Sequence, residues 1–270
     1  MERHIDKSMK RPLIALTNDD GIKSPGLYAL ARAMLTLGEV LIVAPKDQQT
    51  SMGRAFTGTG RLEPVDYSVD GKRVRAFAVA ATPAIAVRNA ILLYAERTPD
   101  LLVSGINYGE NVANGVTISG TVCAALEGAT HRVPALAVSQ ATPVSYHKSY
   151  SSLIDFSTAA QFARLFARRI LLRGMPRGAD VLNLNVPEGA TRQTPWRWTR
   201  VSRYNFFHSI VRVGKHGRFL KGYEVDLDRE TPERDSDVRA VVVDRVVSVS
   251  PLTFDLTARV SAKERARWGS

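Results

Sequence analysis

Cysteine is nearly absent from this sequence: Cys123 is the single one in 270 residues. One cysteine cannot form a disulfide within the chain, which suits a reducing compartment, and its apolar neighbours predict a buried, inert thiol. Long apolar runs are also absent, since none approaches the roughly 18 residues of a membrane-spanning helix. The first residues are polar and do not resemble a signal peptide. We therefore expect a soluble, cytoplasmic protein with no membrane partner.

Acidic residues are missing from one long stretch. The chain has 37 Lys and Arg against 26 Asp and Glu, and residues 192–221 hold eight basic residues, interleaved with aromatic ones, and no acidic one. Such a surface attracts nucleic acid, nucleotides or polyphosphate. A solvated hairpin at a subunit interface explains it as simply, and we prefer that interpretation. The remaining composition is that of an ordinary globular protein.

Apolar runs alternate with helical patterns along most of the chain. A run at 13–16 ends in a polar loop, Ser24 and Pro25 open a helical pattern, and a second run follows at 40–44. Such strand–helix–strand units pair in parallel. We therefore expect an α/β fold, a Rossmann-like, mostly parallel sheet flanked by helices. Further strands are expected at 74–79, 101–103, 135–139 and 181–186, with helices opening at 82 and 119 and spanning 153–172.

Four polar clusters fall where these strands end or helices begin, at 18–21, 49–51, 104–107 and 119–121. Ligands of open parallel sheets bind beyond the carboxyl ends of the strands, so the clusters should converge.

Asp19 and Asp20 are adjacent carboxylates, which repel each other unless a cation lies between them. Carboxylate, hydroxyl and amide oxygens suit Mg²⁺ or Mn²⁺. A solvated Asp-Asp-Gly turn is the plain alternative. The buried strand before the pair and the glycine turn after it favour the metal.

The next two clusters offer amide and hydroxyl oxygens. Asn107 would be an amide ligand, and Gly105 and Gly109 would let backbone approach a bound group. Thr50 and Ser51 are adjacent hydroxyls, although most such groups only cap turns.

The last cluster, Ser119-Gly120-Thr121, opens a helix. Free backbone N–H groups beside a glycine make an anion site there. Simple N-capping by Ser119 or Thr121 is the commoner explanation of an isolated match. Its position at the same edge of the sheet as the carboxylates favours phosphate.

Taken in order, these motifs resemble the SurE family of nucleotidases, the stationary-phase survival proteins. The match runs from residue 13 to about 257, nearly the whole chain. It departs mildly where the family's Gly-Thr-Pro is Ala81-Thr82-Pro83. The matching segments are 17–22 with 25–26, 43–45 with 49–51, 81–83, 103–111, 119–122, 183–187, and 248–252 with 255–257.

The resemblance implies a phosphatase that hydrolyses nucleoside monophosphates, with 3′-nucleotides and short polyphosphate as further substrates, and one Mg²⁺ or Mn²⁺ per subunit. It carries over Asp19, Asp20 and Asn107 as catalytic residues and metal ligands. The family's serine ligand aligns with Thr50, and Ser51 beside it stays an alternative. Substrate and phosphate binding would fall to Asn18, Gly105, Gly109, Asn111, Ser119, Gly120 and Thr121.

The resemblance also implies a homodimer or homotetramer whose C-terminal segments exchange between subunits. We expect a single domain with a flexible tail at 1–12, an α/β catalytic core at 13–189, and a β-hairpin and C-terminal oligomerisation region at 190–270. Hairpins are expected over 190–250, followed by a helical tail to residue 268.

Two alternative functions stay open, a covalent phosphatase mechanism and nucleic-acid binding, and so does the identity of the proton donor. Asp19 or Asp20 could be a covalent nucleophile, although aspartyl-phosphate enzymes usually separate their two carboxylates by one residue. Residues 192–221 could bind nucleic acid or polyphosphate without turnover, but we expect no stable nucleic-acid complex. His208 is a candidate proton donor to the leaving group, and an ordinary surface histidine is an equal explanation.

Overall fold

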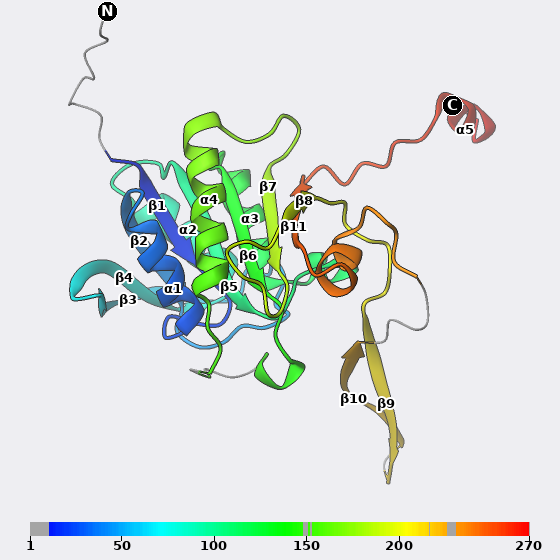
Figure 1. Ribbon diagram of the computed structural model, residues 1–270, viewed down its shortest axis with the longest axis horizontal. Helices are drawn as coiled ribbons and strands as arrows, with labels where there is room; N and C mark the ends of the chain where they lie inside the picture. The colour runs from blue at the N-terminus through cyan, green and yellow to red at the C-terminus, as the bar shows by residue number, and fades with distance from the viewer. Residues whose placement is uncertain (1–10, 148–150, 152, 216, 226–230, 270) are drawn as a thin grey trace, which may run out of the picture.

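A computed structural model describes residues 11–147, 151, 153–215, 217–225 and 231–269. The tail expected at 1–12 thus lies almost wholly outside the described residues. Within them, a nine-stranded sheet forms the centre of the molecule and a two-stranded hairpin projects from it (Figure 1).

The sheet is parallel through its middle. Its strand order is β3-β4-β2-β1-β5-β6-β7-β11-β8, and the pairings from β4 to β7 are all parallel. Strands β1, β2, β5, β6 and β7 are buried along almost their whole length, as expected of a parallel sheet covered on both faces. The bounds are Leu13–Thr17 (β1), Glu39–Pro45 (β2), Lys72–Ala81 (β4), Leu101–Tyr108 (β5), Ala135–Gln140 (β6) and Val181–Val186 (β7).

Helices cover both faces of the sheet (Figure 1). Helices α1 (Pro25–Met34) and α4 (Ser157–Arg173) pack together on one face. Helices α2 (Pro83–Asn89) and α3 (Gly120–Thr130) pack together on the other. The expected α/β fold, with a mostly parallel sheet between helices, is confirmed.

The start of α1 follows directly from its sequence. The Ser24 hydroxyl accepts a hydrogen bond from the Gly26 N–H at 3.2 Å, and a proline in the first turn loses no needed donor. The helix buries the face that carries Leu27, Leu30 and Met34. Burying that face orients the helix over the sheet and fixes where the loop from β1 returns.

The edges of the sheet differ from the expectation. Strand β3 (Gly58–Val69) was not expected, because as an antiparallel edge strand it alternates exposed and half-buried residues and has no apolar run. Strand β7 is not the last core strand, since β11 (Val247–Leu252) pairs antiparallel with it and β8 (Trp196–Trp198) pairs with β11. Part of the region expected as hairpins thus extends the main sheet.

The expected hairpin is present as β9 (Phe207–Gly214) and β10 (Gly217–Val225). Residues 239–243, which lie within the range expected to form hairpins, form a single π-helical turn instead. Helix α4 begins four residues later than expected, where the Ser157 N–H meets the Asp155 carboxylate at 2.8 Å.

The C-terminal tail leaves the body of the molecule and ends in the short helix α5 (Ala262–Arg267) (Figure 1). This helix is shorter than the one expected. In the part of the chain described, no helix combines the length and apolarity needed to cross a membrane.

Candidate active site

The two aspartates follow β1 where the strand order reverses. Strand β1 has β2 on one side and β5 on the other, and a crevice opens at this point in doubly wound sheets. Asp19 and Asp20 come just after Thr17, the last residue of β1, and Asn107 lies near the end of β5. The structure therefore brings these three predicted residues to one edge of the sheet.

A tight turn holds the aspartates in place. The Asn18 side chain closes it from both ends, accepting from the Gly21 N–H at 3.1 Å and donating to the Gly21 carbonyl at 3.0 Å. The Gln49 N–H donates to the Asp19 carbonyl at 2.7 Å. Asn18 thus acts as a structural clamp of this turn, and its part in substrate binding stays a prediction.

Both carboxylates are buried, with Asp19 4% and Asp20 2% exposed. Asp19 accepts a hydrogen bond from the Thr121 hydroxyl. Asp20 accepts from the Gln48 amide at 3.1 Å and the Tyr108 N–H at 3.3 Å. Neither forms an ion pair with any residue that the structure describes.

Burial raises the pKa of the Asp19 carboxyl to about 6. The pKa of Asp20 is also raised well above its ordinary value, by burial and then by the negative charge of Asp19. Two buried carboxylates without a cation cost free energy. This cost is what a bound divalent cation would remove.

The start of helix α3 lies directly against Asp19. The Ser119 hydroxyl caps the helix by accepting from the Val122 N–H at 3.1 Å, so the plain capping role is met. A Cβ on Gly120 would lie 2.6 Å from the Asp19 Cβ, so only glycine permits this approach. Helix start and carboxylate therefore adjoin one small volume.

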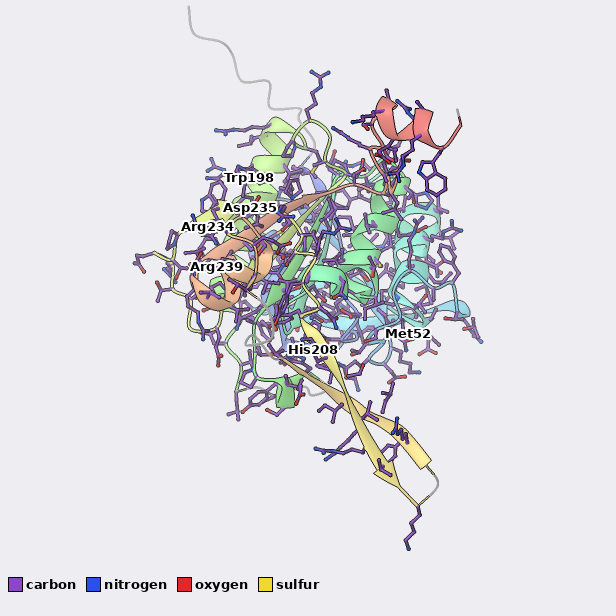
Figure 2. The ribbon with its side chains drawn as sticks, turned by 90° about the vertical axis from the view of Figure 1, so that its right-hand side faces the viewer. Met52, Trp198, His208, Arg234, Asp235 and Arg239 are labelled. Carbon is purple, nitrogen blue, oxygen red and sulfur yellow. The ribbon has the colours of Figure 1, made fainter. Side chains whose placement is uncertain are left out.

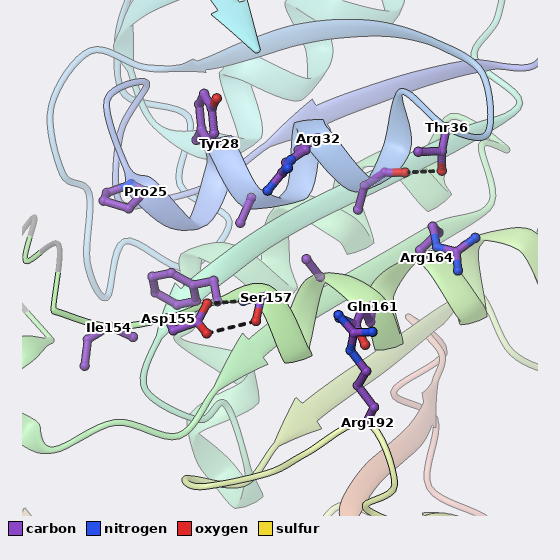
Figure 3. Close-up of a pocket in the computed structure, with 14 residues that line it drawn as sticks. Pro25, Tyr28, Arg32, Thr36, Ile154, Asp155, Ser157, Gln161, Arg164 and Arg192 are labelled. Carbon is purple, nitrogen blue, oxygen red and sulfur yellow. Dashed lines mark hydrogen bonds between the residues drawn. The ribbon is translucent and has the colours of Figure 1, made fainter. Parts of the chain in front are cut away.

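That volume is a cavity of about 120 Å³. Seven predicted site residues line it, whereas the other five, Asn18, Asp20, Gly105, Gly120 and Thr121, are not among its lining residues. A larger groove of about 590 Å³ lies between α1 and α4 and contains none of the predicted residues (Figure 3). The seven are Asp19, Thr50, Ser51, Asn107, Gly109, Asn111 and Ser119.

Two predicted glycines have packing reasons of their own. A Cβ on Gly105 would lie 2.2 Å from the Val138 carbonyl oxygen, between β5 and β6. A Cβ on Gly109 would lie 2.5 Å from the His147 ring. Gly105 thus serves strand packing, while Gly109 also lines the cavity.

A polar network holds Asn111 at the cavity wall. Its N–H donates to the Asn185 side chain at 2.8 Å, and its carbonyl accepts from the Asn183 amide at 2.9 Å. Its own amide donates to the Ser139 hydroxyl at 2.8 Å. The two asparagines alternate along β7, a polar pattern inside a buried strand that could have pointed to the site.

Seven further lining residues were not predicted: Tyr108, Glu110, Gly115, Ile118, His147, Phe207 and Tyr223. Phe207 and Tyr223 lie at the base of the hairpin, with ring centroids 5.2 Å apart. His208, labelled beside them at the hairpin base in Figure 2, does not line the cavity. The hairpin therefore forms part of the cavity wall. No local sequence motif indicates this, because Phe207 and Tyr223 are far in sequence from residues 107–119 of the same cavity.

The donor set suits a hard divalent cation. It would combine carboxylate oxygens from Asp19 and Asp20, the Asn107 amide oxygen and a hydroxyl from Thr50 or Ser51. Among the described residues there is no group of three His, Cys, Asp or Glu side chains that could hold a metal. A softer, histidine- or cysteine-rich site is thus not found in that part of the chain.

A profile of the family described as Survival protein SurE matches residues 14–208. The chain belongs to the SurE family. The resemblance inferred from the motifs is thereby confirmed.

SurE relatives match over nearly the full chain. A 5′-nucleotidase SurE of Thermococcus kodakarensis is 39% identical over 252 residues, covering 93% of this chain and 96% of its own. One of Methanothrix thermoacetophila is 40% identical over 257 residues, with coverages of 93% and 96%. The crystal structure of the SurE protein from Aquifex aeolicus matches with a TM-score of 0.74 at 28% identity, covering 96% of this chain and all of that one.

Proposed function

We propose that this SurE chain is a metal-dependent phosphatase, a 5′-nucleotidase that hydrolyses nucleoside monophosphates to nucleoside and phosphate. The supporting observation is one small cavity lined by the buried Asp19, whose neighbour Asp20 is buried as well, by the first residue of a helix cap and by two aromatic rings. The relatives that share 39–40% identity carry the name 5′-nucleotidase SurE. We extend the proposal to 3′-nucleotides and short polyphosphate as further substrates.

One Mg²⁺ or Mn²⁺ per subunit would be held by Asp19, Asp20, Asn107 and Thr50, with Ser51 as the alternative hydroxyl. When bound, such a cation supplies positive charge for the phosphate and makes water a stronger acid near it. The raised pKa values of both aspartates favour this proposal, because a cation relieves the cost of their burial.

The chain's own groups would hold the phosphate. Backbone N–H groups at the start of α3, beside Ser119, attract an anion. The hydrogen-bond network of Asn111 fixes another part of the cavity wall, so the phosphate would enter a preorganised polar site that also suits the charge of the transition state. Phe207 and Tyr223 offer apolar faces on which a nucleoside can rest.

The covalent rival is less well supported. A nucleophilic aspartate needs a free carboxylate oxygen aimed at phosphorus. Asp20 accepts hydrogen bonds on both oxygens and does not line the cavity. Asp19 does line it, so trapping of a phospho-aspartate would favour this rival.

The alternative function, nucleic-acid binding by residues 192–221, is less well supported because some of the basic side chains form ion pairs. Arg197 pairs with Asp244 at 2.6 Å, and Arg200 pairs with Asp235 at 2.8 Å. Figure 2 shows Trp198, Asp235 and Arg239 gathered on one side of the body. Ion pairs of this kind neutralise part of the basic stretch, so salt-dependent binding of long oligonucleotides is not expected.

We further propose a cytoplasmic homodimer or homotetramer that exchanges C-terminal segments. The supporting observation is the apolar exposure of the tail and hairpin: Leu256 is 89%, Trp268 87% and Val213 78% exposed. Large apolar side chains exposed on segments that project from the body would be covered by a partner subunit in such an exchange. Light scattering that shows only monomer at micromolar concentration would contradict the exchange.

The test of the activity is a phosphate-release panel. The full chain is incubated with 5′- and 3′-nucleoside monophosphates and short polyphosphate, in Mg²⁺, in Mn²⁺ and in chelator. We expect release from 5′-monophosphates with metal and none in chelator. Equal release in chelator, or none from any nucleotide, would refute the proposal.

A further inference from the structure

Hydrolysis of a nucleotide needs a proton for the leaving oxygen, because an alkoxide is a poor leaving group. The donor must reach the cavity. Five titratable side chains line it: Asp19, Tyr108, Glu110, His147 and Tyr223. The Tyr108 hydroxyl donates its hydrogen to the Ser151 carbonyl at 3.0 Å, so it is not directed at the leaving oxygen. Asp19 serves as a proposed metal ligand and already accepts from Thr121, so it must stay ionised.

His147 has no proton to give. Its Nε2 lies 3.1 Å from the Thr142 carbonyl oxygen, which can only accept, so Nε2 carries the hydrogen. Its Nδ1 lies 3.0 Å from the Tyr223 hydroxyl and therefore accepts. Burial lowers the pKa of this histidine, which keeps the ring neutral.

The hydroxyl hydrogen of Tyr223 is used in the hydrogen bond to His147 and is not available to a substrate. Its hydroxyl hydrogen points to His147, so its oxygen can accept but not donate toward the cavity. Burial and then the charge of Glu110 raise the pKa of the phenol, which makes it a weaker acid. The histidine–tyrosine pair is thus a fixed wall rather than a proton source.

Glu110 is the remaining group. It is half-buried, lies between Gly109 and Asn111 on the cavity wall, and forms no ion pair within the described parts of the chain. The backbone that carries it is anchored, since the Gly109 N–H donates to the Gln140 carbonyl at 2.8 Å. Glu110 is therefore a well-anchored part of the cavity wall, and no cationic side chain of the described residues is paired with it.

Burial is the main influence on the protonation of Glu110. It raises the pKa of the carboxyl to about 7, a hydrogen bond from the residue's own backbone N–H opposes this rise, and the negative charge of Glu188 adds to it. Tyr223 on β10 and His147 after β6 are neutral. A carboxyl with such a pKa is well matched to proton transfer near neutral pH.

We propose that Glu110 is the catalytic proton donor to the leaving oxygen; this rests on the proposed phosphatase function. As the P–O ester bond breaks, its electron pair stays on the leaving oxygen, which takes the carboxyl proton and becomes the nucleoside hydroxyl. Water provides the oxygen that bonds to phosphorus, and its protons pass to phosphate and solvent. Solvent then reprotonates Glu110, so ester and water give alcohol and phosphate.

The experiment compares two substrates that differ in their need for a proton. A nucleoside 5′-monophosphate releases an alkoxide, whereas p-nitrophenyl phosphate releases a phenolate that leaves without one. In Glu110→Gln, kcat for the nucleotide should fall on the order of 100-fold, and kcat for p-nitrophenyl phosphate by no more than about 3-fold. Glu110→Asp keeps an acid and should recover part of the nucleotide rate.

Each outcome decides something. An equal loss on both substrates, or no loss on either, overturns the role of Glu110. A parent protein that hydrolyses neither substrate overturns the proposed function instead. Turnover of p-nitrophenyl phosphate by the variant also reports that its site is folded. If Glu110→Gln fails to fold, the nucleotide-to-phenyl rate ratio of Glu110→Asp decides: a ratio equal to that of the parent counts against the proposal, and a lower ratio supports it.

Discussion

The Nε of Arg54 lies 2.7 Å from Oε2 of Glu127, a carboxylate wholly buried in helix α3. Arg88 of α2 binds the other oxygen at 2.6 Å. Burial alone would raise the pKa of Glu127, but the two guanidinium groups lower it below its ordinary value. Since Arg54 lies in the loop that carries Thr50 and Ser51, this ion pair ties the hydroxyl cluster to the helix that starts at the cavity.

Glu127→Gln should therefore weaken both stability and metal binding. We expect a loss of about 1–3 kcal/mol in the free energy of unfolding, less than for a fully buried pair because both arginines are partly exposed. The metal concentration for half-maximal activity should rise. Asp66→Asn is the matched control, since its pair with Arg73 is more than 80% exposed. Urea melts and metal titrations of activity check both; identical behaviour of the two variants would contradict the link.

Thr50→Ala and Ser51→Ala should differ from each other. Both side chains line the cavity, but a single metal ion needs only one hydroxyl from this loop. We expect Thr50→Ala to lose more metal affinity, and Thr50→Ser to restore it because the hydroxyl returns. Calorimetric Mn²⁺ titration measures the affinities. A larger loss in Ser51→Ala would assign the ligand to Ser51, and no loss in either would remove the loop from the metal site.

Phe207→Ala should raise KM for nucleotides by about 5- to 20-fold, as expected from the loss of one buried aromatic face. Phe219→Ala is the matched control on the same hairpin, because Phe219 is 53% exposed and does not line the cavity. Steady-state kinetics with nucleoside monophosphates measures both. Equal KM values in parent and Phe207→Ala would show that the hairpin base does not contact substrate.

Asp19→Asn should stabilise the metal-free protein in a pH-dependent way. Burial raises the folded-state pKa of Asp19 from 3.8 to about 6, so the folded protein loses stability as pH rises through that window. Above pH 6 the variant should exceed the parent by at most about 3 kcal/mol, and near pH 4 the difference should vanish. Urea unfolding in chelator at several pH values measures this. A difference independent of pH would contradict it, and Mn²⁺ should reverse the order.

Strands with apolar runs and helices with capping residues could be predicted from the sequence, because each depends on neighbouring residues. The apolar run of β1 and the Ser24-Pro25 start of α1 lie as expected. Strand β3 escaped prediction because an exposed edge strand needs no apolar run, and β11 escaped because its pairing with β7 joins segments about 65 residues apart. Long-range pairing of this kind leaves no local pattern.

The candidate site divides in the same way. Asp19, Asn107 and Ser119 stand at strand ends or helix starts, positions that periodicity reveals, and the structure brings them to one cavity. The wall formed by His147 and Tyr223 comes from a loop and a hairpin that meet only in the folded chain. Burial, which makes Glu110 a weak acid, is likewise a property of the fold and not of the sequence around it.

Metal-dependent phosphate release by Asp19→Asn and Asp20→Asn tests the central claim most directly. Each variant is titrated with Mn²⁺ in a calorimeter and assayed with a nucleoside 5′-monophosphate beside the parent. We expect both to fold, to bind Mn²⁺ far more weakly and to lose most turnover, because an amide cannot replace the charge of a carboxylate ligand. Asn107→Ala should lose less, since its ligand is neutral. If Asp19→Asn binds Mn²⁺ and releases phosphate like the parent, the proposed site is wrong.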